Sequence, residues 1–282
     1  MKFRALRWID QFVFALFVSI FIFSIVFPFY WIMLSSFTPK YELFTVPPRY
    51  WFSTFTLENY QTLANSIPLT RYFVNSLFFA AGSSFISVAA AFLASYALAR
   101  LQFRGANFVF IAFVMSIALP QVGGLVPLFE VFKATNLINT YHGLVILMSS
   151  LVLPFTVWIL VPFLRQIPYE IEEAAIIDGA RLPQLFWFII LPIMRPALAT
   201  MAIINFIIAW NELVYPLVFA TSGINKTLSV GLVELAVQPT AGGGRPWDLL
   251  SALSMVMILP ILLLVLLFQR MIVSGLTRGA VK

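Results

Sequence analysis

The chain has 282 residues, of which 61% are hydrophobic and only 10% are charged. A soluble domain carries about 25% charged residues, so this chain cannot cover its surface with polar groups and lipid must cover it. With no cysteine and a single histidine, disulfides, thiolate catalysis and Cys- or His-based metal centres are excluded. The net charge of +6 fits a bias of basic residues toward the cytoplasm better than nucleic-acid binding.

Residues 1–11 form a short basic segment, expected to be a cytoplasmic N-terminal tail. Residues 12–34 follow as an uncharged apolar run that can cross a bilayer core of roughly 30 Å. Because this run is too long for a signal peptide and no cleavage site follows it, it is predicted to be the first transmembrane helix. Residues 35–70 are predicted to form a periplasmic loop, where Pro47-Pro48 prevents a continuous helix.

Five further apolar stretches each have about the length of a membrane-spanning helix, and they lie within a core of residues 71–272. They cover residues 72–98, 108–129, 143–164, 198–220 and 250–268. Several contain proline, which buried spans tolerate where neighbours satisfy the freed carbonyl groups. The predicted fold class is therefore all-α, a polytopic membrane protein with about six transmembrane helices and a short cytoplasmic helix between the fourth and fifth.

Six spans place both termini on one side of the membrane. With the N-terminus inside, 11 of the 17 basic residues lie in the cytoplasm and the other six outside, as the positive-inside rule requires. The inner set is Lys2, Arg4, Arg7, Arg100, Arg104, Arg165, Arg181, Arg195, Arg270, Arg278 and Lys282. This orientation also puts the loop of residues 165–195 in the cytoplasm.

That loop is the most polar interruption of the apolar sequence, because Glu170, Glu172, Glu173 and Asp178 fall close together. A helix is predicted over residues 169–177, since proline precedes it and a turn dipeptide follows it. A second short helix is predicted from about residue 183 toward residue 191, with the next proline, at position 192, breaking or kinking it. Helix, sharp turn and helix would form a knob that fits a groove in another protein.

The spacing within this loop carries a resemblance. It reads Glu173-Ala174-Ala175, three residues, Gly179, nine residues, Ile189, one residue and Leu191-Pro192. This pattern resembles the EAA signature of the membrane subunits of bacterial ABC importers. The resemblance implies a coupling helix that docks on a separate ATP-binding subunit through Glu173, Ala174, Ala175, Asp178 and Gly179. The plain alternative is an ordinary acidic loop between two spans.

Two further segments are similar to that family. Trp210-Asn211-Glu212 is predicted in the middle of the fifth span, where a carboxylate is costly unless it faces protein or water. These residues could line the substrate pathway, or Glu212 could bond to a neighbouring helix or a partner subunit; residues 209–213 also resemble a recurrent segment of sugar-type permeases. Asn75-Ser76-Leu77 resembles the element where the family's core domain begins, although a polar pair at a helix entry explains it equally well.

Residues 273–282 are predicted to be a cytoplasmic tail. They are similar to the tail of the maltose-type permease subunit, which implies that Thr277, Arg278 and Lys282 contact the ATPase dimer; the plain alternative is a short basic tail that marks the inside. The resemblance also relates residues 221–248, the last outer loop, to a loop that can reach into the cleft of the binding protein.

The chain has no G-x-x-x-x-G-K-[ST] phosphate cradle and no catalytic constellation, so it is predicted to be no enzyme and to leave ATP to a partner. The resemblance implies a permease subunit of a carbohydrate importer, for a sugar, glycoside or polyol, in the bacterial inner membrane. Its expected partners are an ATPase dimer, a second permease subunit, and a periplasmic or lipid-anchored binding protein. The alternatives are a passive or proton-coupled carrier, a membrane scaffold, or an importer of an amino acid or phosphorylated polyol.

Overall fold

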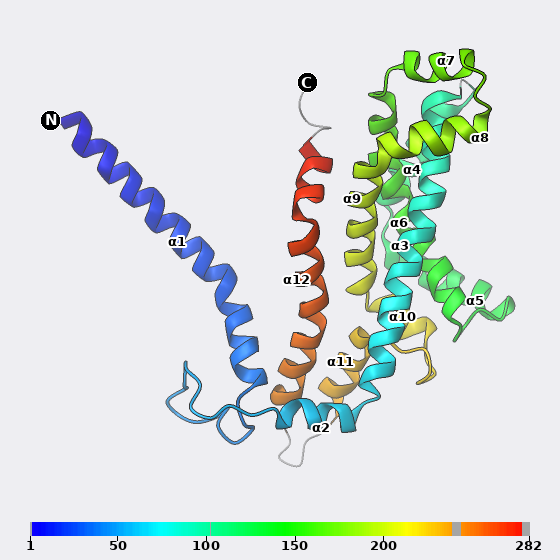
Figure 1. Cartoon of the computed structure of the whole chain (residues 1–282). Coiled ribbons are helices and arrows are strands. Elements are labelled where there is room, and N and C mark those ends of the chain that lie inside the picture. The colour runs from blue at the N-terminus through cyan, green and yellow to red at the C-terminus, as the bar shows by residue number, and fades with distance from the viewer. Residues whose placement is uncertain (1, 102, 239–243, 278–282) are drawn as a thin grey trace. The chain divides into compact units, whose positions relative to one another are not determined.

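The structure is a computed structural model that describes residues 2–101, 103–238 and 244–277 (Figure 1). Helices are the only regular elements in these three ranges. In chain order they are α1 (Lys2–Ser36), α2 (Glu58–Ser66), α3 (Leu69–Arg100), α4 (Ala106–Ile117), η1 (Gln121–Gly124), α5 (Leu125–Ala134), α6 (Tyr141–Arg165), α7 (Tyr169–Ile177), α8 (Leu182–Leu185), η2 (Phe186–Ile190), α9 (Leu191–Trp210), α10 (Val214–Phe219), α11 (Leu228–Val237) and α12 (Trp247–Thr277).

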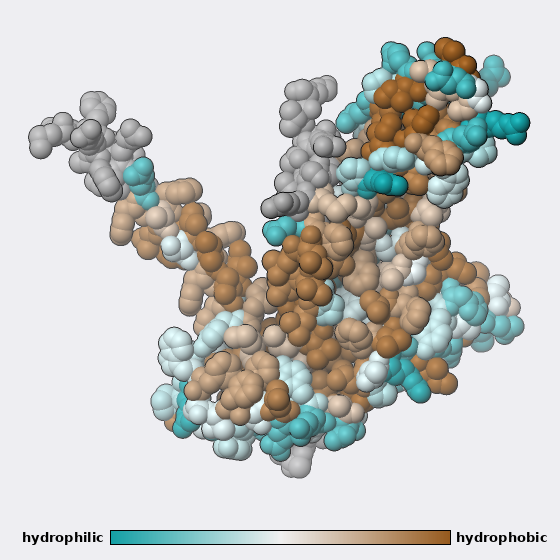
Figure 2. Space-filling model, in the orientation of Figure 1, coloured by the Kyte–Doolittle hydropathy of each residue, from teal (hydrophilic) through white to brown (hydrophobic). Residues whose placement is uncertain are grey.

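Five helical segments in the described chain are long and apolar enough to cross a membrane. They are Gln11–Ser36, Leu69–Arg100, Tyr141–Arg165, Leu182–Trp210 and Trp247–Gln269, and the bent pair of α4 and α5 can supply a sixth. Apolar residues cover α1 and α12, and polar residues gather around α7 (Figure 2). The prediction of an all-α polytopic membrane protein with about six spans is therefore confirmed.

The backbone divides into two compact units. The first, Met1–Leu69 with Gly231–Pro260, contains α1, α2 and the first part of α12. In this unit the Asn59 amide donates to the carbonyl groups of Ser36 and Thr38, at 3.0 and 2.9 Å. The first bond satisfies the carbonyl of the last residue of α1, which a helix leaves without a partner, and the second holds the chain just after it, so together they fix α2 to that end.

The second unit, Thr70–Val230 with Ile261–Lys282, contains the helices from α3 to α10. Its apolar core is built largely from α3, α6 and α9, and includes the fully buried side chains of Val157, Leu160 and Leu164. Small polar residues support this packing, since Ser84 donates to the Ala202 carbonyl at 2.6 Å. Such residues let helices approach closely and bond to each other where water is absent.

The predicted third span, residues 108–129, does not form one straight helix. Instead, α4 ends at Ile117, and the following helical segment, Val122–Ala134, is bent from it by 97°. Between them lies Pro120, which has no amide hydrogen to donate, and the second segment opens with the pair Gly123-Gly124, which helices disfavour. The chain therefore forms a broken span or a re-entrant loop here.

The fifth span also differs from its predicted bounds of residues 198–220. The helix begins at Leu182 and ends at Trp210, and it passes through Pro192 instead of breaking there. The turn before this proline is π-helical, with the amide of Leu191 bonded to the carbonyl of Phe186. A π-turn widens the backbone locally, which relieves the clash between a proline ring and the preceding turn.

Candidate functional site

The short helix α7 (Tyr169–Ile177) has the bounds that the sequence predicts. It lies beyond the ends of α3 and α6 in the second unit (Figure 1). Pro168 precedes it, and Glu170 and Glu172 occupy its first turn. Acidic side chains in this position interact favourably with the positive end of the helix dipole. Local sequence alone therefore accounts for the start of this helix.

The end of α7 is a tight reversal that depends on Gly179. The amide of Ala180 bonds to the carbonyl of Ala175 at 2.9 Å, and the amide of Gly179 bonds to that of Ile176 at 3.0 Å. This pair of bonds is the Schellman motif, which requires a left-handed residue after the helix. Gly179 adopts φ +86°, which glycine reaches without steric cost. The predicted turn is thus confirmed, and it leads directly into α8.

One face of α7 is bonded to α3. The carboxylate of Glu172 accepts from Arg100 Nε at 2.5 Å and from the Tyr96 hydroxyl at 3.2 Å. Arg100 also donates to the carbonyl of Ile167 at 2.8 Å, and its guanidinium lies 4.3 Å from the centre of the Tyr169 ring. Both charged side chains are almost fully buried, so each is costly without the other. Sequence reasoning missed this pair.

The opposite face of α7 is free within the described chain. Glu170, Glu173, Ala174 and Ile177 follow the i, i+3, i+4, i+7 spacing of one helical face and are exposed, with Ile177 at 84%. Asp178 and Gly179, just after the helix, are also exposed. Ala175 is instead buried against the core. Four of the five predicted coupling residues therefore lie outward, and the fifth packs inward.

The segment Trp210-Asn211-Glu212 lies at the C-terminal end of α9, and not inside one helix over residues 198–220 as predicted. Trp210 is the last residue of α9, buried, with its ring stacked on Phe206. The amide of Asn211 donates to the carbonyl of Ile207 at 2.8 Å. Glu212 accepts from the amide of Val214 at 2.8 Å, at the start of α10. This carboxylate satisfies a helix N-terminus, which favours its structural interpretation.

Asn75 and Ser76 hold the loop before α11 against α3. The Asn75 amide donates to the carbonyls of Ile224 and Lys226, both at 2.8 Å, and its oxygen accepts from the Tyr141 hydroxyl at 2.8 Å. The Ser76 hydroxyl accepts from the amide of Leu228 at 2.8 Å. This pair therefore makes long-range contacts in addition to sitting near a helix entry.

A buried polar cluster joins α3, α6 and α9, and sequence reasoning missed it. The fully buried Asn205 amide donates to the hydroxyls of Thr156 and Ser87, at 2.8 and 3.4 Å. Its own oxygen has no partner among the described residues. The available signal was a single carboxamide within an apolar run, which is costly in a membrane unless neighbours bond to it.

The predicted tail contacts involve Thr277, Arg278 and Lys282. Thr277 is the last residue of α12, and Arg278 and Lys282 lie outside the described residues.

In the described part of the chain no group of three or more His, Cys, Asp or Glu residues could hold a metal ion.

These features define a helical membrane protein with a short exposed acidic helix that a buried ion pair attaches to a span. No family model matches the chain. The sulfoquinovosyl glycerol transport system permease protein SmoH of Agrobacterium fabrum is 35% identical over 265 residues, or 94% of this chain and 91% of SmoH. The trehalose/maltose transport system permease protein MalG of Thermococcus litoralis is 34% identical over 259 residues, or 91% of each chain.

A solved structure shows the same fold. It is a bacterial ABC transporter involved in the import of the acidic polysaccharide alginate, with a TM-score of 0.82 and 19% identity, covering 93% of this chain and 96% of that one. Together with the two relatives, this places the chain plainly: it belongs to the family of permease subunits of carbohydrate ABC transport systems. The resemblance carried by the EAA signature is confirmed.

Proposed function

We propose that this permease subunit carries a sugar, glycoside or polyol across the bacterial inner membrane, driven by a separate ATPase. SmoH and MalG belong to transport systems for sulfoquinovosyl glycerol and for trehalose and maltose, which are all polyhydroxylated. One observation supports a separate ATPase as the energy source. Helix α7 is bonded to α3 on one face, and its other face is exposed and available for a partner. The subunit itself performs no chemical reaction, and ATP is bound by its partner.

The exposed face of α7 would dock in a groove of the ATPase. Glu173 offers a carboxylate for a basic group there, and Ala174 is small enough to permit close approach. When ATP closes the ATPase dimer, the groove moves and α7 moves with it. The Glu172–Arg100 contact passes this displacement to α3, and the chain after Gly179 passes it to the span that begins at Leu182.

Two spans displaced together would switch the pathway between inward and outward access. The remaining partners are a second permease subunit, which supplies the other side of the pathway, and a binding protein that delivers substrate to the outer loops. In this arrangement both termini lie in the cytoplasm, and residues 273–282 extend toward the ATPase dimer. Packed helices switch between discrete arrangements and do not deform gradually. A rigid connection from α7 to the spans would therefore move them as units.

The test is uptake of labelled sugar into cells or proteoliposomes that contain the complete system. Depletion of ATP, with the membrane potential held constant, should abolish uptake. Uptake that persists would support a passive or proton-coupled carrier instead. A co-purifying ATPase whose turnover no substrate stimulates would support a scaffold, and stimulation by an amino acid or a phosphorylated polyol alone would overturn the carbohydrate assignment.

A further inference from the structure

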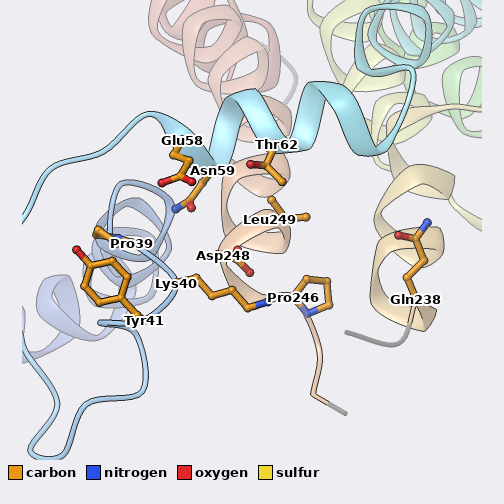
Figure 3. Close-up of a pocket in the computed structure, with 10 residues that line it drawn as sticks. All are labelled: Pro39, Lys40, Tyr41, Glu58, Asn59, Thr62, Gln238, Pro246, Asp248 and Leu249. Carbon is orange, nitrogen blue, oxygen red and sulfur yellow. The ribbon is translucent and has the colours of Figure 1, made fainter. Parts of the chain in front are cut away.

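A pocket of about 380 Å³ opens within the first unit (Figure 3). It lies between the loop after α1, helix α2 and the first turn of α12, with Gln238 at the end of α11. This volume is in the range of small-molecule sites. The walls are fixed by internal bonds, since Asn59 joins α2 to the end of α1 and the amide of Leu250 bonds to the carbonyl of Pro246 at 2.9 Å.

Asp248 lines this pocket and has no hydrogen-bond donor among the described residues. It is the second residue of α12 and only 7% exposed. Figure 3 shows its carboxylate in the middle of the pocket, near the side chain of Lys40. Because this carboxylate faces the pocket, water or a bound ligand must supply the hydrogen-bond donors that its oxygens accept from. The natural occupant of this pocket therefore donates hydrogen bonds.

The charges around the pocket favour a neutral occupant. Glu58 and Asp248 are acidic and Lys40 is basic, and the ion pairs found in the described chain involve other residues. The two carboxylates would repel an anion, and the Lys40 ammonium offsets one of the two negative charges that would attract a cation. Hydroxyl groups can donate to the carboxylates and also accept from Lys40 and from the Gln238 amide. Tyr41, 75% exposed, adds an aromatic face at the rim for a sugar ring.

We propose that this pocket is an accessory carbohydrate site, separate from the translocation pathway, that holds one neutral sugar unit or a linear polyol. The choice of ligand class rests on the proposed function, and so does the outward position of the pocket. In such a site Asp248 accepts from the ligand hydroxyls and Lys40 donates to them. The site would retain substrate at the outer surface independently of the binding protein.

The experiment measures binding to the assembled transporter in nanodiscs without binding protein. The probes are trehalose, maltose and sorbitol, with argininamide as a cationic comparison, and the readout is equilibrium dialysis together with saturation-transfer NMR. Asp248→Asn should weaken sugar binding about tenfold, as expected for loss of a charged acceptor. Thr62→Phe fills the pocket from an exposed position and should remove this binding. Glu130→Gln, an exposed carboxylate of α5 outside the pocket, should change nothing.

Sugar binding that is equal in wild type, Asp248→Asn and Thr62→Phe would overturn the proposal, as would an absence of sugar binding in the wild type. Displacement of sugar by argininamide, or binding of argininamide alone, would also overturn it in favour of a basic side chain from a partner protein. Thr62 is exposed, so this variant should fold even if Asp248→Asn does not. Failure of the proposed function would show separately, as absence of ATP-dependent uptake by the wild type.

Discussion

The guanidinium of Arg100 and the carboxylate of Glu172 are in direct contact across 72 residues of sequence, with 2.5 Å between Nε and Oε1. Arg100 is the last residue of α3, and Glu172 lies in the first turn of α7. The contact attaches a short surface helix to the end of a span, so any force on α7 reaches α3 through a buried bond. A helix of nine residues is too short to be stable alone in water, and this anchor accounts for its fixed position.

Glu172→Gln should therefore destabilise the protein, whereas the same change at exposed Glu170 should have little effect. Removing one partner of a buried ion pair costs about 3–5 kcal/mol because the other charge remains unpaired. The double variant Arg100→Leu, Glu172→Leu should recover part of this loss. Thermal unfolding of the purified protein in detergent checks the prediction. Equal effects of Glu172→Gln and Glu170→Gln would contradict the anchoring role.

Gly179 should tolerate asparagine better than aspartate or valine. No atom lies within 4 Å of a Cβ placed there, so the cost comes from the left-handed backbone, about 1–2 kcal/mol for most residues and less for asparagine. Gly179→Asp adds a charge on the exposed face and should leave membrane insertion intact while abolishing uptake. Gly179→Asn should retain measurable uptake. Normal uptake by a stably inserted Gly179→Asp variant would rule out the coupling role.

Asn75→Ala should cost more stability than Asn211→Ala. The Asn75 side chain makes three hydrogen bonds in a buried position, and each buried group left without a partner costs about 1–3 kcal/mol. The exposed Asn211 makes a single bond within its own helix. Limited proteolysis of the loop at residues 221–227 measures the difference. Similar cleavage rates in the two variants would show that Asn75 does not hold this loop.

Glu42, in the loop after α1, should make that loop sensitive to acid. Hydrogen bonds from the Ser53 and Thr54 hydroxyls, and the charge of Arg49, lower the pKa of this carboxyl below its usual value. A lowered pKa contributes stability above the unfolded-state pKa, about 4.3 for Glu, and loses it as pH falls through the folded value. Loop protection against proteolysis should therefore fall below about pH 4 in the wild type. Glu42→Gln should remove this pH dependence, and an unchanged profile in that variant would refute the assignment.

Sequence reasoning located α7 and its turn because both depend on local signals, namely proline at the entry, acids in the first turn and glycine at the exit. Sequence reasoning could not tell that Glu172 is buried and Glu173 exposed, because the burial of Glu172 depends on its contact with Arg100, which is distant in sequence. The fifth span was misplaced for a similar reason. Hydropathy does not register the π-turn that lets the helix pass Pro192, nor does it show that Glu212 has left the helix and caps the next one.

The most direct test of the account is ATP hydrolysis by the assembled complex in liposomes, measured with and without binding protein and a panel of sugars and polyols. We expect stimulation by a binding protein loaded with one ligand of this panel. Glu173→Lys, which reverses a charge on the exposed face of α7, should lose this stimulation while the complex remains inserted. Failure of every loaded binding protein to stimulate hydrolysis, or full stimulation of the Glu173→Lys complex, would contradict the coupling of α7 to an ATPase.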